Sequence, residues 1–163
     1  MKQTSEGYVL APAILRLLAF MIDLAVLVVI QLALMETLGV VQYHDDGRPV
    51  NAESVVLPIV VAAIYNIAFV AYKGATIGKM AMSIYVCYPD GERVRPDTAI
   101  LRHVISLIES IIVIGSLVSV VLLFTDSQRR TIHDRVAGTI VLAGQLGKPL
   151  KVSDVERSEQ RGP

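Results

Sequence analysis

The sequence predicts an all-α integral membrane protein that also carries a small cytoplasmic β-hairpin or sheet. Apolar residues make up 53% of the 163 residues, charged residues only 18%, and the mean hydropathy is +0.57. A soluble domain of this size is more polar. The apolar residues gather in three long stretches, and the polar segments between them differ in their balance of acidic and basic residues. Such alternation is typical of loops on opposite sides of a membrane.

The first apolar stretch, residues 11–35, is long enough to cross a hydrocarbon core of roughly 30 Å as a helix. We expect the helix to begin near Pro12, because proline in the first helical turn gives up no hydrogen bond. A cleaved signal peptide is the alternative interpretation. It is disfavoured because Lys2 is the only basic residue before the stretch, which also exceeds the roughly 7–15 residues of a signal-peptide core.

Residues 36–54 form a polar loop that is rich in turn-forming residues and carries more acid than base. His44 and the two aspartates after it are a candidate weak metal site, although a solvated turn explains them better, because coordination needs a second group of ligands. The second apolar stretch, residues 55–72, is just long enough to span a membrane. Asn66 is its one strongly polar side chain.

Residues 73–98 leave the membrane and change character. The run 83–88 is rich in β-branched and aromatic residues, and the turn-forming residues 89–92 follow it, which predicts a short strand and hairpin. Basic residues outnumber acidic ones here, so by the positive-inside rule the segment faces the cytoplasm. Two spanning helices then place the amino terminus in the cytoplasm and the loop 36–54 outside.

The third apolar stretch, residues 99–125, leaves two alternatives open. One long spanning helix would place the next segment outside, although that segment holds Arg129, Arg130 and Arg135. A turn near Gly115 would instead return the chain to the cytoplasm as a re-entrant helical hairpin. Each arm would then be about 18 Å long, too short to cross the core, and its turn must be covered by protein or water.

An internal repeat favours the hairpin. The residues Ala13–Arg16 recur as Ala99–Arg102, and an acid follows seven positions after each arginine, Asp23 in one copy and Glu109 in the other. Each copy therefore predicts a helix that begins with arginine and carries a carboxylate into apolar surroundings, where charge is costly.

The segments that follow the helices also align. Residues 76–86 match residues 131–141 without a gap, and both begin with Thr-Ile and end with valine. The tandem units cover residues 11–88 and 97–143. Because a parallel repeat puts both Thr-Ile turns on the same side of the membrane, we expect the runs 83–88 and 138–143 to pair into a small sheet beneath the helices.

Asp23 is the most unusual charge, because it lies about 16 Å along the first helix from Pro12, near the middle of the membrane. A carboxylate at that depth takes up a proton or finds a cation. Arg16 lies about 10 Å away on the same helical face and so has a better partner across the bundle. Two interpretations stay open: Asp23 is a functional ion or proton site, or buried pairs only fix the helix register.

Glu109 and Asp134 carry similar alternatives. Glu109 lies among small residues, including serines, that let helices approach closely. Packing explains the serines but not the charge of Glu109. The alternative is that Glu109 lies near the cytoplasmic surface of the membrane, where a charge costs little. Asp134 either caps the turn that follows His133, or pairs with Arg16 at the cytoplasmic end of the first helix.

These residues together resemble a known family. An arginine begins the first membrane helix (Arg16), an aspartate lies within it (Asp23), Gly-x-Thr-x-Gly-Lys follows the second (74–79), and His-Asp-Arg-Val-Ala-Gly-Thr comes near the end (133–139). The pattern over residues 8–143 is similar to that of the RDD family of small bacterial membrane proteins. The family takes its name from one arginine and two aspartates, which correspond here to Arg16, Asp23 and Asp134. The resemblance implies transport, and for some members sodium–proton exchange.

We therefore expect a bacterial inner-membrane protein that moves Na⁺, K⁺, H⁺ or a small solute, with Asp23 as the proton- or cation-binding carboxylate. Two or three spanning segments hardly shield a polar path from lipid, which implies a homo-oligomer or a larger membrane partner. The intramembrane candidates are Asp23, Arg16, Glu109 and Asn66. The residues of the expected cytoplasmic gate or brace are Asp134, His133, Lys79 and Arg102.

The rival hypothesis is a non-transporting accessory protein, whose charges fix its helix packing and whose cytoplasmic face docks a partner. An enzyme is not expected, because the chain lacks a paired acid–base site, an activated nucleophile or a metal cluster. No cofactor is expected, and the net charge of zero gives no reason for a nucleic-acid partner. We expect a single membrane domain over residues 8–145, followed by a disordered polar tail over residues 146–163.

Overall fold

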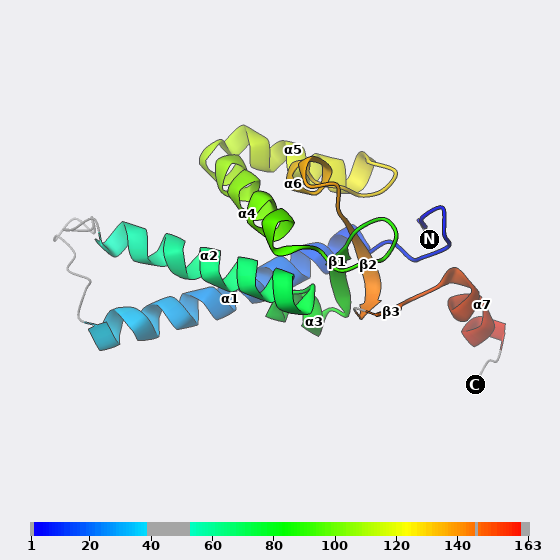
Figure 1. Ribbon diagram of the computed structural model, residues 1–163, viewed down its shortest axis with the longest axis horizontal. Helices are drawn as coiled ribbons and strands as arrows, with labels where there is room; N and C mark the ends of the chain where they lie inside the picture. The colour runs from blue at the N-terminus through cyan, green and yellow to red at the C-terminus, as the bar shows by residue number, and fades with distance from the viewer. Residues whose placement is uncertain (1, 39–52, 146, 161–163) are drawn as a thin grey trace.

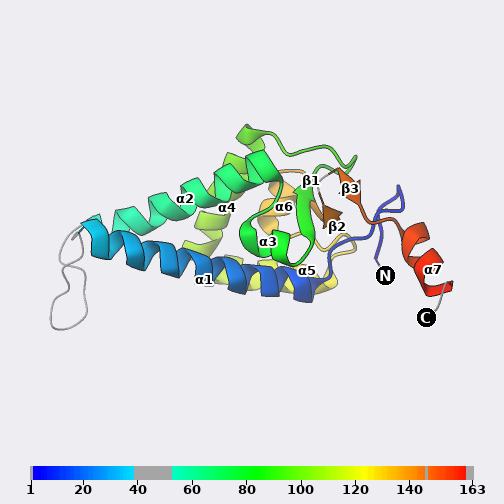
Figure 2. The ribbon, with the colours of Figure 1, turned by 90° about the horizontal axis from the view of Figure 1, so that it is seen from below.

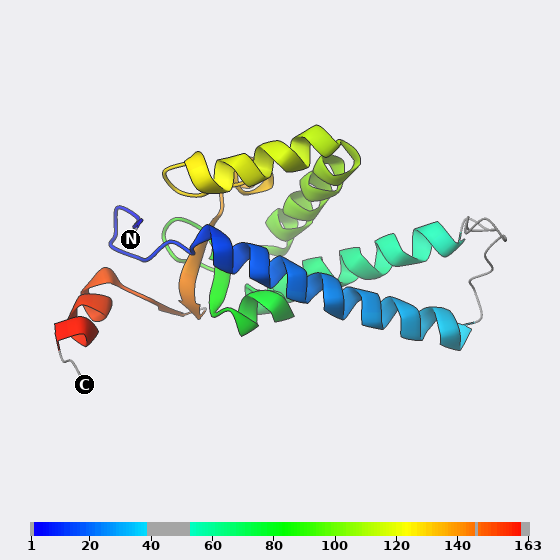
Figure 3. The same cartoon turned by 180° about the vertical axis from the view of Figure 1, so that it is seen from behind.

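The computed structural model describes residues 2–38, 53–145 and 147–160. In chain order its elements are α1 (Ala13–Leu38), α2 (Glu53–Lys73), α3 (Ile77–Ala81), β1 (Ile84–Cys87), α4 (Pro96–Ile111), α5 (Val113–Thr125), α6 (Ile132–Val136), β2 (Ile140–Gln145), β3 (Lys148–Pro149) and α7 (Val152–Gln160). The long helices α1 and α2 run away from the sheet, and α4 and α5 form a bent pair beside them (Figure 1). The sheet lies beside the start of α1 and the end of α2, near the short helices α3 and α6 (Figure 3).

Helices α1 and α2 are long and apolar enough to cross a membrane, the latter over Val56–Lys73. This confirms the helices predicted over 11–35 and 55–72. Helix α1 begins one residue after Pro12, as expected. Many of the large apolar side chains on both helices are exposed, as they are on a surface that faces lipid. The predicted loop that joins these helices, with its candidate metal group at His44, lies outside the described residues for most of its length.

The third apolar stretch is not one continuous helix. Helix α4 ends at Ile111 and α5 begins at Val113, and the two are bent by 116° at the break. The break comes at Ile112, three residues before the predicted turn at Gly115. The reason is that Gly115 serves close packing instead: a Cβ there would lie 3.2 Å from the Cα of Glu109. The bend brings the end of α5 back toward the sheet, as the predicted hairpin requires (Figure 1).

The small sheet forms as predicted, between the runs 83–88 and 138–143. Strands β1 and β2 pair antiparallel, and the short strand β3 continues the sheet on the other side of β2. All four side chains of β1 are buried, and the sheet core packs against the beginning of α1, the end of α2 and the beginning of α4. The predicted turn after β1 closes with a hydrogen bond of 3.0 Å from the Tyr88 amide to the Glu92 carbonyl. Helix α3 lies beside α1 at this end of the molecule (Figure 2).

The segment expected to be a disordered tail, residues 146–163, carries secondary structure in its described part. Strand β3 is followed by α7. Contacts with the amino-terminal segment accompany this structure: the Val152 amide donates to the Gly7 carbonyl at 3.0 Å, and the Lys151 ammonium lies 5.7 Å from the centre of the Tyr8 ring. These contacts with a distant segment cannot be recognised in the sequence, and the polar composition of residues 146–163 by itself is typical of disorder.

Candidate functional site: two buried carboxylate clusters

Two segments beside the sheet have the same local structure. Helices α3 and α6 are each five residues long, and each begins directly after a threonine in extended backbone, Thr76 and Thr131. The strands that follow pair so that Val86 lies opposite Val141. These valines end the two aligned segments, so the register is the one that a two-fold relation between the segments requires. We call residues 11–88 the first unit and residues 97–143 the second unit.

The backbone matches on both sides of these short helices. Two residues before the threonine, Gly74 and Arg129 have positive φ values of 68° and 53°. Two residues after the helix, Ser83 and Gly138 have positive φ values of 50° and 65°. Non-glycine residues seldom adopt this left-handed backbone. In each pair the fold imposes it on both positions, although only one of the two is glycine.

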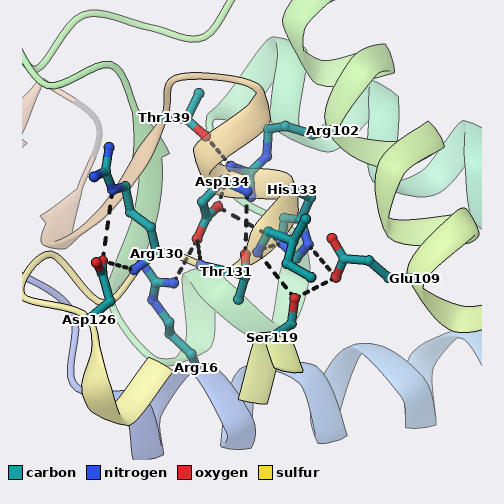
Figure 4. A network of polar contacts seen from close by, with 11 residues as sticks. Arg16, Arg102, Glu109, Ser119, Asp126, Arg130, Thr131, His133, Asp134 and Thr139 are labelled. Carbon is teal, nitrogen blue, oxygen red and sulfur yellow. Dashed lines mark hydrogen bonds and ion pairs between the residues drawn. The ribbon is translucent and has the colours of Figure 1, made fainter. Parts of the chain in front are cut away.

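The first cluster centres on Asp134, which is fully buried. Arg16 of α1 donates to its Oδ2 at 2.9 Å, and Arg102 of α4 donates to its Oδ1. Arg102 also donates to the hydroxyl of Thr139. The two arginines occupy corresponding positions in the two units and converge on one carboxylate (Figure 4). The cluster therefore ties α1, α4 and α6 together.

Asp134 also caps its own helix. The Thr131 amide donates to its Oδ2 at 3.2 Å, and the Asp134 amide donates to the Thr131 hydroxyl, a capping box at the start of α6. Burial alone would raise the pKa of Asp134, but the charges of Arg102 and Arg16 hold it well below its usual range. The structure thus contains both contacts considered for Asp134, the cap and the pair with Arg16.

The second cluster centres on Asp23, which is also buried. Its carboxylate accepts hydrogen bonds from the Tyr65 hydroxyl at 2.7 Å, the Thr76 hydroxyl at 2.6 Å and the Gly78 amide at 2.7 Å. Gly78 approaches so closely that a Cβ there would lie 2.1 Å from the Ala19 carbonyl oxygen. All three partners donate, and they come from α2, from α3 and from the threonine that precedes α3. Asp23 therefore fastens α3 to α1 and α2.

Lys79 lies next to this cluster, in the position of α3 that corresponds to Asp134 of α6. Its Nζ is 3.5 Å from the Thr76 hydroxyl. Burial, followed by the charge of Arg102, lowers the pKa of Lys79 to about 8. A cation thus occupies the place in the first unit where the second unit has a carboxylate.

Glu109, which corresponds to Asp23, has a different environment near the end of α4. Its Oε2 accepts a hydrogen bond from the Ser119 hydroxyl at 2.7 Å and lies 3.3 Å from Nδ1 of His133. The other carboxylate oxygen, Oε1, is buried and has no hydrogen-bond partner within the described residues. Ser116 closes the bend by donating to the Glu109 carbonyl at 2.8 Å. Glu109 is thus buried but incompletely bonded.

Comparison with protein-family models identifies the family of this chain. The model described as the RDD family matches residues 10–138, which is most of the chain. The chain belongs to the RDD family. No curated protein and no solved structure matches it. The RDD residues Arg16, Asp23 and Asp134 thus form two buried clusters, with Arg16 and Asp134 in direct contact and Asp23 in the other cluster.

Of the predicted site residues in this RDD protein, Asn66 alone takes no part in the clusters described. Its side-chain amide donates to the Ala62 carbonyl of the same helix at 2.9 Å. Sequence reasoning did not assign Tyr65 and Thr139 to the site, although both bond directly to its charged groups. Thr139 had a signal, since it ends the His-Asp-Arg-Val-Ala-Gly-Thr motif, whereas no local pattern distinguishes Tyr65 from an interface tyrosine.

A third polar cluster closes the loop after α5, outside the apolar helices. The carboxylate of Asp126 accepts hydrogen bonds from the Arg130 amide at 2.8 Å and from the Arg135 side chain at 2.6 Å. Lys2 donates to the Asp126 carbonyl at 2.7 Å, which joins the amino terminus to this loop. Burial opposes the ionised form of Asp126, but these bonds and charges lower its pKa. Within the described ranges, no group of three or more histidine, cysteine or acidic side chains is placed to hold a metal ion.

Proposed function

We propose that this RDD-family membrane protein binds a proton or a small monovalent cation at Glu109 and carries it across the membrane. The observation behind this proposal is the buried Oε1 of Glu109, which has no hydrogen-bond partner within the described residues. A carboxylate oxygen in apolar surroundings is costly to leave bare. A proton or a cation such as Na⁺ or K⁺ would satisfy it.

The position of Glu109 supports the proposal. It lies two residues before the end of α4, where unpaired carbonyl groups give a helix its partly negative end and attract a cation. Membrane transporters use broken helices in this way to bind Na⁺ or H⁺. The ring of His133, whose Nδ1 lies 3.3 Å from Oε2 of Glu109, is a second polar group beside this position.

The bent pair also fits a re-entrant hairpin. Helices of 16 and 13 residues are about 24 Å and 20 Å long, shorter than a core of roughly 30 Å. We propose a bacterial inner-membrane location, with the sheet and the amino terminus in the cytoplasm, because basic residues surround the sheet end. So few helices leave a polar path exposed to lipid, so we further propose a homo-oligomer.

An accessory role without transport is the second candidate, and a separate observation favours it. Asp23 and Asp134 each have three or more donors, as expected of charges that fix helix packing. In this case the RDD residues would act only as a brace and the cytoplasmic face would dock a partner.

Proton flux into proteoliposomes, followed with an internal pH dye under an imposed Na⁺ or K⁺ gradient, tests the proposal. Glu109→Gln should abolish flux while the variant assembles like the wild type. Glu36→Gln, the same change at the exposed end of α1, is the matched control and should transport normally. Undiminished flux in Glu109→Gln would refute the site, and no flux in any protein would favour the accessory role.

A further inference from the structure

An apolar groove of about 400 Å³ lies on the outside of the molecule, between α2 and the start of α4. One side of it is the face of α2 from Val60 to Tyr72, and Pro96 closes it at the sheet end. The groove is hollow because three of its residues on α2 are alanines, Ala63, Ala68 and Ala71. It is separate from the buried carboxylate clusters.

The length and direction of the groove fit a lipid chain. Val60 and Tyr72 are 12 residues apart, about 18 Å along a helix. One leaflet contributes about half of a hydrocarbon core of roughly 30 Å, or about 15 Å. Tyr72 is 73% exposed, and tyrosine at this place marks the boundary between hydrocarbon and headgroups. The groove thus follows α2 through the depth of the leaflet on the sheet side.

The end of the groove near the sheet is basic. Lys73 follows Tyr72 directly and is exposed. Arg95 precedes Pro96, is 73% exposed in its side chain, and pairs with the exposed Asp97 at 3.0 Å. Lys73 and Arg95 outnumber Asp97, which leaves one positive charge in excess at this end of the groove, whereas Arg93 is balanced by the adjacent Glu92. Basic residues beside the membrane surface attract anionic lipid headgroups.

We propose that this groove binds one anionic phospholipid, with an acyl chain along α2 and the phosphate beside Lys73 and Arg95. The chain fills the hollow left by the alanines, and the basic residues select the headgroup. This site does not depend on ion binding at Glu109.

Native mass spectrometry of the delipidated, purified protein tests the proposal. The probes are phosphatidylglycerol and phosphatidylcholine with identical acyl chains, together with glycerol phosphate as the headgroup without a chain. We expect one phosphatidylglycerol bound per chain, at least tenfold tighter than phosphatidylcholine, and no binding of glycerol phosphate. The double variant Lys73→Glu, Arg95→Glu should remove that preference. The double variant Lys148→Glu, Arg157→Glu, which makes the same change of charge at exposed residues away from the groove, is its charge-matched control.

Filling the groove is the second arm. Ala68→Phe should lower phosphatidylglycerol binding at least tenfold, and Ala63→Leu replaces it if that variant does not assemble. Leu32→Phe, on the exposed face of α1, is the control and should bind like the wild type. Unchanged lipid binding in both groove variants would overturn the proposal. It would also be overturned if they broke up an oligomer instead, or if glycerol phosphate bound as tightly as the lipid.

Discussion

The two units place an acid in the same position and use it differently. In the first unit Asp23 meets Gly78, and in the second Glu109 meets His133. Gly78 and His133 are both the second residue of their short helix. Glycine lets the backbone of α3 approach so closely that its amide donates to Asp23 at 2.7 Å, whereas the ring Nδ1 of His133 lies 3.3 Å from Oε2 of Glu109. Asp23 thus attaches α3 firmly, whereas Glu109 keeps one oxygen without a hydrogen-bond partner among the described residues.

The next position along the short helices differs in charge. Lys79 occupies it in α3 and Asp134 in α6. Arg16 and Arg102, which correspond to each other, therefore both bind the second unit's carboxylate, and Lys79 is the cation left beside Asp23. A nearly symmetric backbone thus carries an asymmetric set of charges.

The largest effect should follow from removing the carboxylate that both units share. Asp134→Asn leaves Arg16 and Arg102 buried without a counter-charge. A buried pair that loses one partner costs about 3–5 kcal/mol. We expect a loss of this size in the free energy of unfolding, measured in detergent with denaturant.

Asp126→Asn is the matched control, because Asp126 binds arginines outside the apolar helices. Its loss should be nearer 1 kcal/mol, because the partner arginines Arg130 and Arg135 are 31% and 45% exposed in their side chains, so that water screens their charge. Equal losses in the two variants would contradict the view that the units meet at Asp134.

The second prediction compares the corresponding acids. Asp23→Asn should lower the free energy of unfolding by about 2 kcal/mol, because the amide presents one acceptor oxygen to three donors. Glu109→Gln should cost less than about 1 kcal/mol, because one oxygen of Glu109 accepts no hydrogen bond from the part of the chain that the structure describes. Thermal unfolding of both variants in one detergent checks the difference. If Glu109→Gln is less stable than Asp23→Asn, then Glu109 and not Asp23 is the acid with the stronger bonds.

The third prediction concerns pH and Lys79. Its pKa is lowered to about 8 in the folded protein from 10.5, so between these values the unfolded chain binds more protons. Stability should therefore rise with pH from about 8 to 10.5, by at most about 1.4 kcal/mol per pH unit. Lys79→Met should remove this rise and be more stable than the wild type near pH 7. If stability still rises with pH in Lys79→Met, a group other than Lys79 causes the rise.

The local sequence predicted the elements whose signals lie within one segment. The length of the apolar runs gave the helices over 11–35 and 55–72, and β-branched composition together with the repeat gave the pairing of 83–88 with 138–143. The break at Ile112 was displaced by three residues. No proline or glycine marks Ile112, and the bend depends on contacts between Glu109 and residues of α5.

The partners of the charged residues were harder to predict. Asp23 bonds to Tyr65, Thr76 and Gly78, which are 42 to 55 residues away. Spacing along a helix shows which face a residue occupies but not which distant segment covers that face. The pair of Arg16 with Asp134 was among the alternatives because both were expected at the cytoplasmic end of the helices, where topology alone brings them near.

The smallest predicted effect tests the equivalence of the units directly. Ser83 and Gly138 occupy corresponding left-handed positions, with φ values of 50° and 65°. Ser83→Gly should stabilise the protein by about 1 kcal/mol, since glycine adopts this backbone without strain. Gly138→Ser should cost a similar amount from backbone strain alone, because a Cβ there meets no atom within 4 Å. If the units are equivalent, the double variant should melt close to the wild type in a thermal scan. A double variant far less stable than the wild type would show that the two turns carry different strain.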